Sequence, residues 1–486
     1  MLYIGIDLGT SSVKLLLVDE KGSILKTAVR EYPLIFPRDG WSEQSPEEWW
    51  KGTLSALEEI TDGTDKSLIK GIGVAGQMHG LVILDENDEV IRPAILWNDG
   101  RTEKEVSYLN DIIGKDKLSE YTANIAFAGF TAPKLLWVKE NEPDNFRKIR
   151  KIMLPKDYIN YMLTGVHACD YSDASGMLLL DVKNKCWSER MLEICSLNKA
   201  MMPELFESYE VIGSVKEEFG FDNAVVVAGA GDNAAAAVGT GTVGNGRCNI
   251  SLGTSGTVFI SSDAFSVDSY NALHSFCHAD GRYHLMGCML SAASCNKWFA
   301  EEILKESDFA ALQRDITRDM TGNNSIYFLP YLMGERSPVN DTDARGAFIG
   351  LSLDTKREDM VLAVLEGVSF AIRDSFEVAK KSGIEITESC LCGGGAKSPL
   401  WRSILANVLG IRLKILKTEQ GPGFGGAILS MVGAGEYRSV DEAAGRLVEF
   451  SEYIIPDEEL TALYEEKYNK FRLLYPALKD VFKKMR

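Results

Sequence analysis

The sequence is 486 residues long, more than one hydrophobic core normally holds, so we expect at least two domains. Its 45% hydrophobic and 25% charged content is that of a globular protein, and its formal net charge of −18 argues against nucleic acids and anionic membrane surfaces as partners. No stretch of about 18 apolar residues occurs. Nine scattered cysteines without a CxxC pair, and a strand that starts almost at residue 1, predict a cytoplasmic protein.

The first elements are three strands and a helix. Residues 3–32 predict a strand, a tight turn, a second strand, a DEKG turn and a third strand. A helix is predicted to start at Ser45, which would be its N-cap, with Pro46 in the first turn and Glu48 closing a capping box. The apolar face of this helix is predicted to carry Trp50, Leu54 and Leu57.

Two glycine-rich segments of the first half follow buried strands. KGIGVAGQMHGLVILD, residues 70–85, predicts a strand, a turn and another strand. VVVAGAGDNAAAAVGTG, residues 225–241, predicts a strand, a turn and an alanine-rich helix. In each segment the turn lies at the end of a strand, where α/β folds place their ligands.

The second half begins with a new hairpin at residues 250–262 and continues with alternating strands and helices. A long helix is predicted from Arg357 to Ser382, with Gly383 as its stop. Residues 389–410 predict a strand, a Gly-Gly-Gly turn and a helix, and the chain from Asp457 onward predicts amphipathic helix. Mixed elements in both halves indicate two α/β domains, residues 1–245 and 246–486, with a hinge near residue 245.

The two hairpins contain the same tetrad, Leu-Gly-Thr-Ser, at residues 8–11 and 252–255. Such a turn presents backbone N–H groups and hydroxyls without a bulky side chain, which suits phosphate oxygens. One copy alone is most often an ordinary hairpin. The repetition favours two hairpins that grip a polyphosphate from both sides, and Asp7 would place a carboxylate there for magnesium. The alternative for Asp7 is a solvated turn acid, which its neighbours Ile6 and Leu8 disfavour.

Other nucleotide-binding motifs do not apply. The chain contains no GxxxxGK[ST] sequence. A GxGxxG match at residues 239–244 follows a helix and precedes a strand, which is the reverse of a dinucleotide-binding fold. We interpret that match as the junction between the domains.

Asp232 lies in Gly231-Asp232-Asn233, where a strand ends and a helix begins. It could be only an N-cap. Its position at the carboxyl end of a strand favours catalysis, and the helix N-terminus is expected to keep its carboxylate ionised and able to accept a proton.

Two further strand ends have polar and aromatic side chains suited to sugar hydroxyls: Gln77, Met78 and His79 at one, and Trp97, Asp99 and Arg101 at the other. A lone histidine is usually a core residue, but His79 has little bulk on either side to bury it. His274, Cys277, His278 and His284 match no standard zinc spacing, and their role is left open. The Gly393–Gly395 turn could admit a ring or a ribose close to the backbone.

Taken together, these motifs resemble those of the FGGY family of carbohydrate kinases over nearly the whole chain. The resemblance is carried by IGIDLGTSSVK, WSEQSPEEWW, GQMHG, PAILWNDGRT, GFTAPKLLWV, LPKDY, GDNAA, SLGTSG, HSFCHA, MLSAASC, FLPYLMGERSP, AVLEGV and GGGAKSPLWR. Among them, GQMHG, LWNDGRT and GFTAPKLLWV resemble the branch of the family that acts on the ketose D-xylulose. One departure is EQGPGFGGAIL, which has more glycine than is usual in the family and leaves the local packing open.

The resemblance implies two ribonuclease-H-like domains of the actin and hexokinase type around a deep cleft. It implies transfer of a phosphoryl group from ATP to D-xylulose with Mg²⁺, with the sugar on the N-terminal domain and ATP on the C-terminal domain, and it allows a homodimer. Asp232 would be the general base and Asp7 the acid near magnesium. The sugar site would include Gln77, Met78, His79, Trp97, Asp99, Arg101, Asp232 and Asn233. The ATP site would include Thr10, Ser11, Ser12, Lys14, Thr254, Ser255, Gly394 and Gly395.

Three alternatives remain at this stage. One is a kinase for another ketose, polyol or sugar acid, such as ribulose, glycerol or gluconate, because one pocket side chain shifts preference by only a few kcal/mol. Another is a chaperone-like or filament-forming ATPase with the same clamp and no sugar, which leaves GQMHG unexplained. The third is an inactive sensor, which the presence of Asp7 and Asp232 disfavours.

Overall fold

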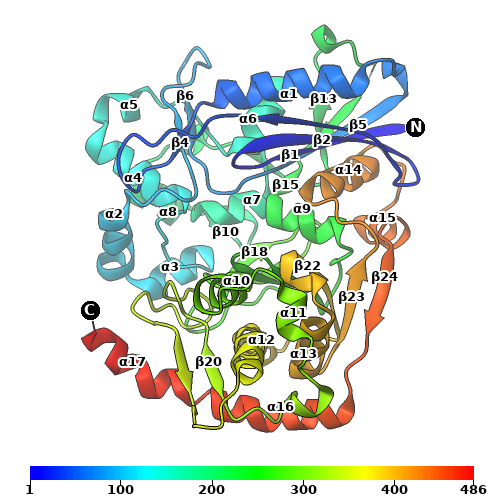
Figure 1. Ribbon diagram of the computed structural model, residues 1–486. Helices are drawn as coiled ribbons and strands as arrows, with labels where there is room; N and C mark the ends of the chain where they lie inside the picture. The colour runs from blue at the N-terminus through cyan, green and yellow to red at the C-terminus, as the bar shows by residue number, and fades with distance from the viewer. Residues whose placement is uncertain (223, 486) are drawn as a thin grey trace.

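The computed structural model describes residues 1–222 and 224–485 and consists of two α/β lobes (Figure 1). Each lobe is built on a seven-stranded sheet. The first sheet contains β13 (Val211–Ser214), β14 (Val225–Val227), β5 (Ile69–Gly76), β1 (Leu2–Leu8), β2 (Ser12–Asp19) and β3 (Ile24–Glu31) in this order, with β15 (Ala230–Gly231) also paired to β5. The second contains β18 (His274–Cys277), β19 (Tyr283–Met289), β17 (Gly256–Ser262), β16 (Arg247–Leu252), β22 (Glu388–Cys392), β23 (Arg412–Leu416) and β24 (Phe450–Ile454).

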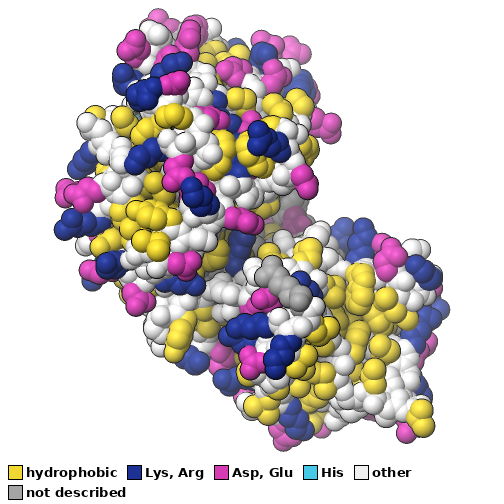
Figure 2. Space-filling model, turned by 90° about the vertical axis from the view of Figure 1, so that its left-hand side faces the viewer, with side chains coloured by type: hydrophobic (Ala, Val, Ile, Leu, Met, Phe, Trp, Pro, Cys, Tyr) yellow, Lys and Arg dark blue, Asp and Glu magenta, His cyan; other side chains and the backbone are white. Residues whose placement is uncertain are grey.

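The two sheets share one arrangement of strands at their centres. In the first, β1 pairs antiparallel with β2 through the first hairpin and parallel with β5 on its other side. In the second, β16 pairs antiparallel with β17 and parallel with β22. This duplication confirms the predicted two α/β lobes and places both Leu-Gly-Thr-Ser turns at the same end of equivalent strands. Figure 2 shows the two lobes as separate masses with a notch between them.

Helices pack against both sheets. The longer ones are α1 (Pro46–Thr61), α4 (Thr131–Asn141), α6 (Pro155–Thr164), α9 (Asp232–Gly239), α12 (Arg357–Lys381), α13 (Pro399–Leu409), α14 (Pro422–Gly433), α15 (Val440–Leu447), α16 (Glu458–Phe471) and α17 (Leu474–Lys484). Shorter ones are α2 (Glu103–Ser107), α3 (Lys115–Thr122), α5 (Pro143–Lys148), α7 (Tyr171–Ala174), α8 (Glu189–Cys195), α10 (Ala293–Trp298) and α11 (Phe309–Gln313). Within the described residues no helix has the length and apolar character needed to span a bilayer.

The helix predicted at Ser45 forms, but two details of that prediction are wrong. Ser45 occupies the N-cap position without a capping hydrogen bond, because its hydroxyl donates to the carboxylate of Glu47. Glu48 instead accepts from Lys51, three residues along the helix, at 2.6 Å. The face buried against the sheet consists of Pro46, Trp49, Thr53, Ala56, Leu57, Ile60 and Thr61, so Trp50 and Leu54 are only half-buried.

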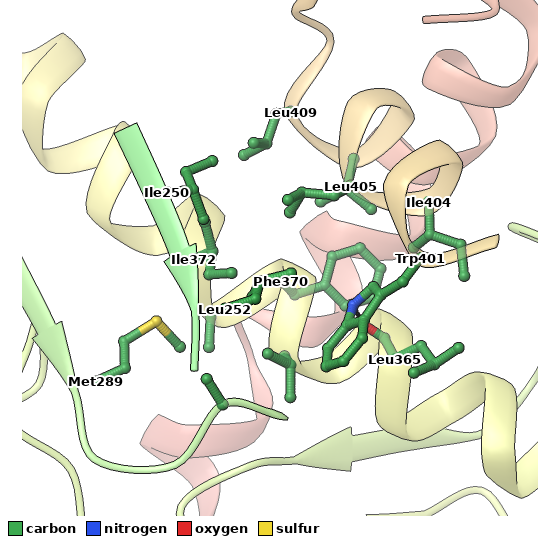
Figure 3. Close-up of a cluster of buried hydrophobic side chains, with 14 of the residues drawn as sticks. Ile250, Leu252, Met289, Leu365, Phe370, Ile372, Trp401, Ile404, Leu405 and Leu409 are labelled. Carbon is green, nitrogen blue, oxygen red and sulfur yellow. Dashed lines mark hydrogen bonds between the residues drawn. The ribbon is translucent and has the colours of Figure 1, made fainter. Parts of the chain in front are cut away.

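The core of the second lobe holds its hairpin and its glycine turn together (Figure 3). Trp401 of α13 is buried, and its indole N–H donates to the backbone oxygen of Leu365 at 3.1 Å and to the hydroxyl of Ser369 at 3.2 Å. A Cβ added to Gly395 would lie 2.9 Å from Cβ of Leu252 and 3.0 Å from the Trp401 ring. The Gly-Gly-Gly turn therefore packs tightly against the strand that leads into the second hairpin.

Helix α14 belongs to the second half of the sequence but packs on the sheet of the first lobe, beside α9 (Figure 1). The close approach requires glycine. A Cβ on Gly425 would lie 1.9 Å from the backbone oxygen of Ala235 in α9, and one on Gly5 or Gly73 would lie 1.9 or 2.0 Å from the α14 backbone. Gly425 of EQGPGFGGAIL thus allows α14 to contact α9, and Gly5 allows it to contact β1, the two elements that carry Asp232 and Asp7.

Candidate active site

The two acids predicted from the sequence, Asp7 and Asp232, lie close enough for the charge of one to affect the pKa of the other. Asp7 is at the end of β1, opposite Lys14 of β2, and Asp232 is the first residue of α9. Burial raises the pKa of Asp7 to about 6, although Lys14 opposes this shift. Burial, and then the charge of Asp7, raise the pKa of Asp232 to about 7, against hydrogen bonds from the backbone N and Nδ2 of Asn233 at 2.7 and 3.0 Å.

The expectation that the helix N-terminus keeps Asp232 ionised is therefore wrong, because burial and the charge of Asp7 raise its pKa by more than the helix end lowers it. A helix end stabilises a carboxylate by roughly 1 kcal/mol, which is less than burial and a second carboxylate cost. Asp232 loses its proton only near neutral pH unless a cation enters the site.

Asp7 fits a hard divalent cation. Within the described residues its carboxylate has no hydrogen-bond partner, and glycines lie beside it: a Cβ on Gly421 would be 3.9 Å from its Oδ2. A half-buried carboxylate without a hydrogen-bond partner, near a second carboxylate, is the oxygen-rich setting that Mg²⁺ prefers. No group of three or more His, Cys, Asp or Glu within the described parts of the chain could hold a metal, so water and phosphate oxygens would have to complete the coordination.

Hydrogen bonds to its backbone oxygens fix the turn of the first hairpin. The backbone N of Gly9 donates to the Ser12 oxygen at 3.0 Å, and the Tyr32 hydroxyl donates to the Gly9 oxygen at 2.5 Å. Gln44 donates to the Thr10 oxygen at 2.7 Å. These bonds occupy backbone oxygens of the turn and leave the hydroxyls of Thr10, Ser11 and Ser12 at a partly exposed surface.

The second hairpin borders a cavity of about 950 Å³ in the second lobe. Three predicted ATP-site residues, Thr254, Gly394 and Gly395, line it together, whereas Ser255 is exposed at the hairpin tip and outside the lining. The remaining walls combine apolar and cationic side chains, including Phe309, Leu400, Trp401, Lys297, Arg314 and Lys397. A cavity of this size, with glycine backbone on one side and cations on another, suits a nucleotide.

Met78 lies beside Gly231 and Asn233, the two residues that flank Asp232, and His79 follows it in the chain. Met78 is buried, with its sulfur 3.9 Å from Nδ2 of Asn233. His79 adopts a left-handed backbone with φ of 68°, and its Nδ1–H donates to the Gly176 oxygen at 2.7 Å. Contrary to the prediction that it has little bulk around it, its ring stacks on Phe130 with centroids 4.7 Å apart. The consequent burial lowers the pKa of His79 to about 3, so the ring is neutral.

Trp97 is the exposed member of the second predicted sugar segment. Its indole N–H donates to the Thr10 hydroxyl at 3.0 Å, which ties this segment to the first hairpin. Gln77 is buried, with its Nε2 3.2 Å from Gln44, under the same hairpin.

Asp99 and Arg101 are buried against each other rather than facing the cleft. Arg101 pairs with Asp99 at 2.7 Å and with Glu43 at 2.7 Å. Its guanidinium lies 3.8 Å from the centroid of Trp41 and 4.9 Å from that of Trp137. The structure thus gives this pair internal partners and brings neither to the open surface of the site.

Two buried lysines that the sequence reasoning missed support the site. Lys134 of α4 donates to the backbone oxygens of His79 and Gly129 at 2.8 and 2.7 Å. Lys156 of α6 lies 2.5 Å from Asp157, 2.9 Å from Asp170 and 3.8 Å from Asp173. A lysine inside an apolar helix, as in TAPKLLWV and LPKDYINYML, was the available signal, because buried cations are rare unless paired.

The four residues considered for zinc are packed into the sheet of the second lobe. His274 stacks parallel to Phe276 at 5.4 Å, and His284 stacks on Phe259 at 3.9 Å. Nε2 of His278 donates to the Thr242 oxygen at 2.9 Å, and Cys277 is buried. Their ring contacts are those of core residues.

Comparisons with known proteins agree with this geometry. The N-terminal domain of the FGGY family of carbohydrate kinases matches residues 2–239, and its C-terminal domain matches residues 248–434. Xylulose kinase of Escherichia coli (strain K12) is 41% identical over 483 residues, covering 98% of this chain and 99% of the relative.

Two solved structures extend the comparison. The xyloylose kinase of Brucella ovis is 39% identical, with a TM-score of 0.94 and coverage of 99% of this chain and all of that one. The gluconate kinase of Lactobacillus acidophilus is 25% identical, with a TM-score of 0.93 over the whole of both chains.

Duplicated lobes of the actin and hexokinase type, two small-residue hairpins and a pair of half-buried acids define an ATP-dependent two-lobed kinase of small molecules. The domain matches and the full-length identity then make the assignment specific. The chain belongs to the FGGY family of carbohydrate kinases.

Proposed function

We propose that this kinase transfers the γ-phosphoryl group of ATP to D-xylulose, forming D-xylulose 5-phosphate and ADP. The observation that carries the proposal is the position of Asp232, which hydrogen-bonds Asn233 beside Met78 and lies near enough to Asp7 for the charge of Asp7 to raise its pKa. A similarity of 41% to a relative named xylulose kinase supports the choice of sugar. In this proposal residues 1–245 supply most of the sugar site and residues 246–486 most of the ATP site.

Each polar group has a defined task in the proposed reaction. Asp232 orients the terminal hydroxyl of the sugar and accepts its proton late, because the transition state of phosphoryl transfer is loose and needs little activation of the nucleophile. Closure of the lobes excludes water and aligns the hydroxyl with the phosphorus. The two hairpins hold the phosphoryl oxygens through the hydroxyls and backbone N–H groups of Thr10, Ser11, Ser12, Thr254 and Ser255. The ammonium group of Lys14 binds the same oxygens.

Asp7 would hold Mg²⁺, which when bound neutralises charge on the phosphate oxygens.

The remaining parts of the proposal concern the cellular location of the protein and its assembly. All nine cysteines are free thiols, which supports a cytoplasmic protein. A homodimer is the proposed assembly and is checked by the mass of the protein in solution.

The sugar specificity is tested with a panel of D-xylulose, ribulose, glycerol and gluconate in an assay that couples ADP release to a chromophore. We expect kcat/KM for D-xylulose to exceed that for each other compound by at least about tenfold. A higher value for gluconate or glycerol would assign the kinase to that substrate instead. ADP release that no sugar stimulates would exclude a sugar kinase altogether.

The pH dependence follows from the raised pKa values of the two acids. Because the base must be ionised to accept a proton, kcat/KM for the sugar is expected to fall as the pH decreases through about 7, the pKa of Asp232. The rate is measured from pH about 5 to about 9 with ATP and Mg²⁺ well below saturation, so that the profile reports the enzyme before the cation binds, and with the coupling enzymes in excess. A profile that stays flat down to pH about 5 would contradict the assignment of Asp232 as the base.

A further inference from the structure

Arg336 lies in the loop between β20 (Tyr327–Leu329) and β21 (Ala347–Ile349) of the second lobe, but its side chain reaches the sugar side of the first. Its guanidinium carbon is 5.5 Å from the ring centroid of Phe127. Its positive charge is among the causes that lower the pKa of both His79 and His274, after burial. It also hydrogen-bonds Cys288, whose own pKa is influenced by Asp232. Arg336 therefore lies in the part of the molecule that contains His79 and Asp232.

The guanidinium has no acidic partner. Within the described residues Arg336 forms no ion pair, although the other arginines around the site, Arg92 and Arg101, each pair with Glu43. The adjacent Glu335 carboxylate accepts the backbone N–H groups of Leu290 and Arg336, both at 2.8 Å, and forms no ion pair with the Arg336 guanidinium within the described residues. A half-buried arginine without a carboxylate keeps several of its five N–H donors free in a fixed planar fork.

The surroundings of these donors are aromatic and come from both lobes. Phe127 and Phe130 of the first lobe have ring centroids 5.5 Å apart, and His274 of the second lobe lies 5.1 Å from Phe127 and 5.6 Å from Phe130. The ring of His79 stacks on Phe130 and so belongs to the same group of rings. Aromatic faces with a few convergent donors are the usual composition of a small-molecule site.

We propose that Arg336 is a specificity-determining residue of the sugar site, which donates hydrogen bonds to the hydroxyl or carbonyl oxygens of the sugar. This inference rests on the proposed sugar kinase function but not on which sugar is used. Since Arg336 belongs to the second lobe, and Met78, His79 and Asp232 to the first, the sugar contacts both lobes. Full affinity for the sugar then requires the lobes to be closed.

The test uses the full-length protein with the variant Arg336→Gln and the matched control Arg345→Gln. Arg345 lies in the same loop and is exposed, and among the described residues its side chain donates only to the backbone oxygens of Thr342 and Ala344. We expect Arg336→Gln to raise the KM for D-xylulose at least about tenfold, since hydrogen bonds from a charged donor are lost. The KM for ATP and the slow hydrolysis of ATP without sugar should stay within about twofold of wild type, as should all constants of Arg345→Gln.

A merely structural role of Arg336 predicts a different pattern. In that case KM for ATP, KM for the sugar and the melting temperature would change together, or none would change, and either result overturns the proposal. If Arg336→Gln does not fold, Arg336→Lys replaces it, because it keeps the charge but loses the planar fork. An unchanged sugar KM in a folded Arg336→Lys protein would also overturn the proposal.

The outcome separates this inference from the choice of D-xylulose. If wild type prefers ribulose, glycerol or gluconate, the same KM comparison is made with that compound, and a rise of at least about tenfold still supports a role for Arg336. If wild type prefers D-xylulose and Arg336→Gln leaves its KM unchanged, only the inference about Arg336 fails.

Discussion

Replacing Asp232 by asparagine is expected to lower the turnover number for sugar phosphorylation by at least ~10²-fold, the smallest loss typical of a removed general base. The amide keeps the shape of the side chain and its neighbours Met78 and Asn233, so the loss would report the missing proton acceptor. The measurement is the steady-state rate of ADP formation with saturating sugar and ATP. An exposed acid, Asp354, supplies the control, since Asp354→Asn should leave the rate unchanged. Near-normal turnover of Asp232→Asn would remove Asp232 from the mechanism.

The same variant should be more stable than wild type at alkaline pH. The pKa of Asp232 in the folded protein is raised from 3.8 to about 7, so folding favours the protonated acid. Its contribution to stability is fully present below the unfolded pKa and is lost as the pH rises through about 7. Asparagine has no charge to bury, so the free energy of unfolding of Asp232→Asn should exceed that of wild type at pH about 8 and equal it near pH about 4. Urea unfolding at the two pH values tests this, and a variant that is less stable at the higher pH would contradict it.

Replacing Gly425 by alanine is expected to lower the free energy of unfolding by at least ~2 kcal/mol, as overpacking of a tight contact does. The added Cβ would lie 1.9 Å from the Ala235 oxygen and 2.6 Å from its carbonyl carbon. Both atoms are backbone of α9, so the contact can be relieved only if α9 and α14 move apart. Because α9 begins at Asp232, this movement should also reduce turnover.

Gly445 of α15 provides a matched control for this substitution. It is also a helical glycine, but a Cβ there meets nothing within 4 Å. Alanine at Gly445 should therefore leave stability unchanged or raise it by up to ~1 kcal/mol, through helix propensity alone. Urea unfolding curves of the two variants decide the issue. An equal midpoint for Gly425→Ala and wild type would show that the two helices are not in backbone contact.

Much of the fold was predictable because its signals are local. The two hairpins were visible as apolar strands around Leu-Gly-Thr-Ser, and the long helix α12 was visible from its apolar periodicity and from Gly383 at its end. The helix at Ser45 was predicted in place but with the wrong buried face, because the pattern of large apolar residues did not show which side the sheet would cover.

The candidate site was predictable only in part. Its strand-end motifs were recognised, and Thr254, Gly394 and Gly395 do line one cavity. The burial of Asp99 and Arg101 could not be predicted, because it depends on Glu43, Trp41 and Trp137, which are distant in the sequence. The functional roles of the residues remain predictions for the variants described above.

The sequence by itself determined the two α/β lobes and the repeated hairpin, because strand and helix periodicity and turn glycines are properties of neighbouring residues. Its motifs also resembled those of one kinase family, which the comparisons then showed. Only the tertiary structure decided the raised pKa of Asp232, the neutral ring of His79 and the approach of Arg336 from the second lobe. These depend on burial and on charges brought together from segments up to hundreds of residues apart, which no local pattern records.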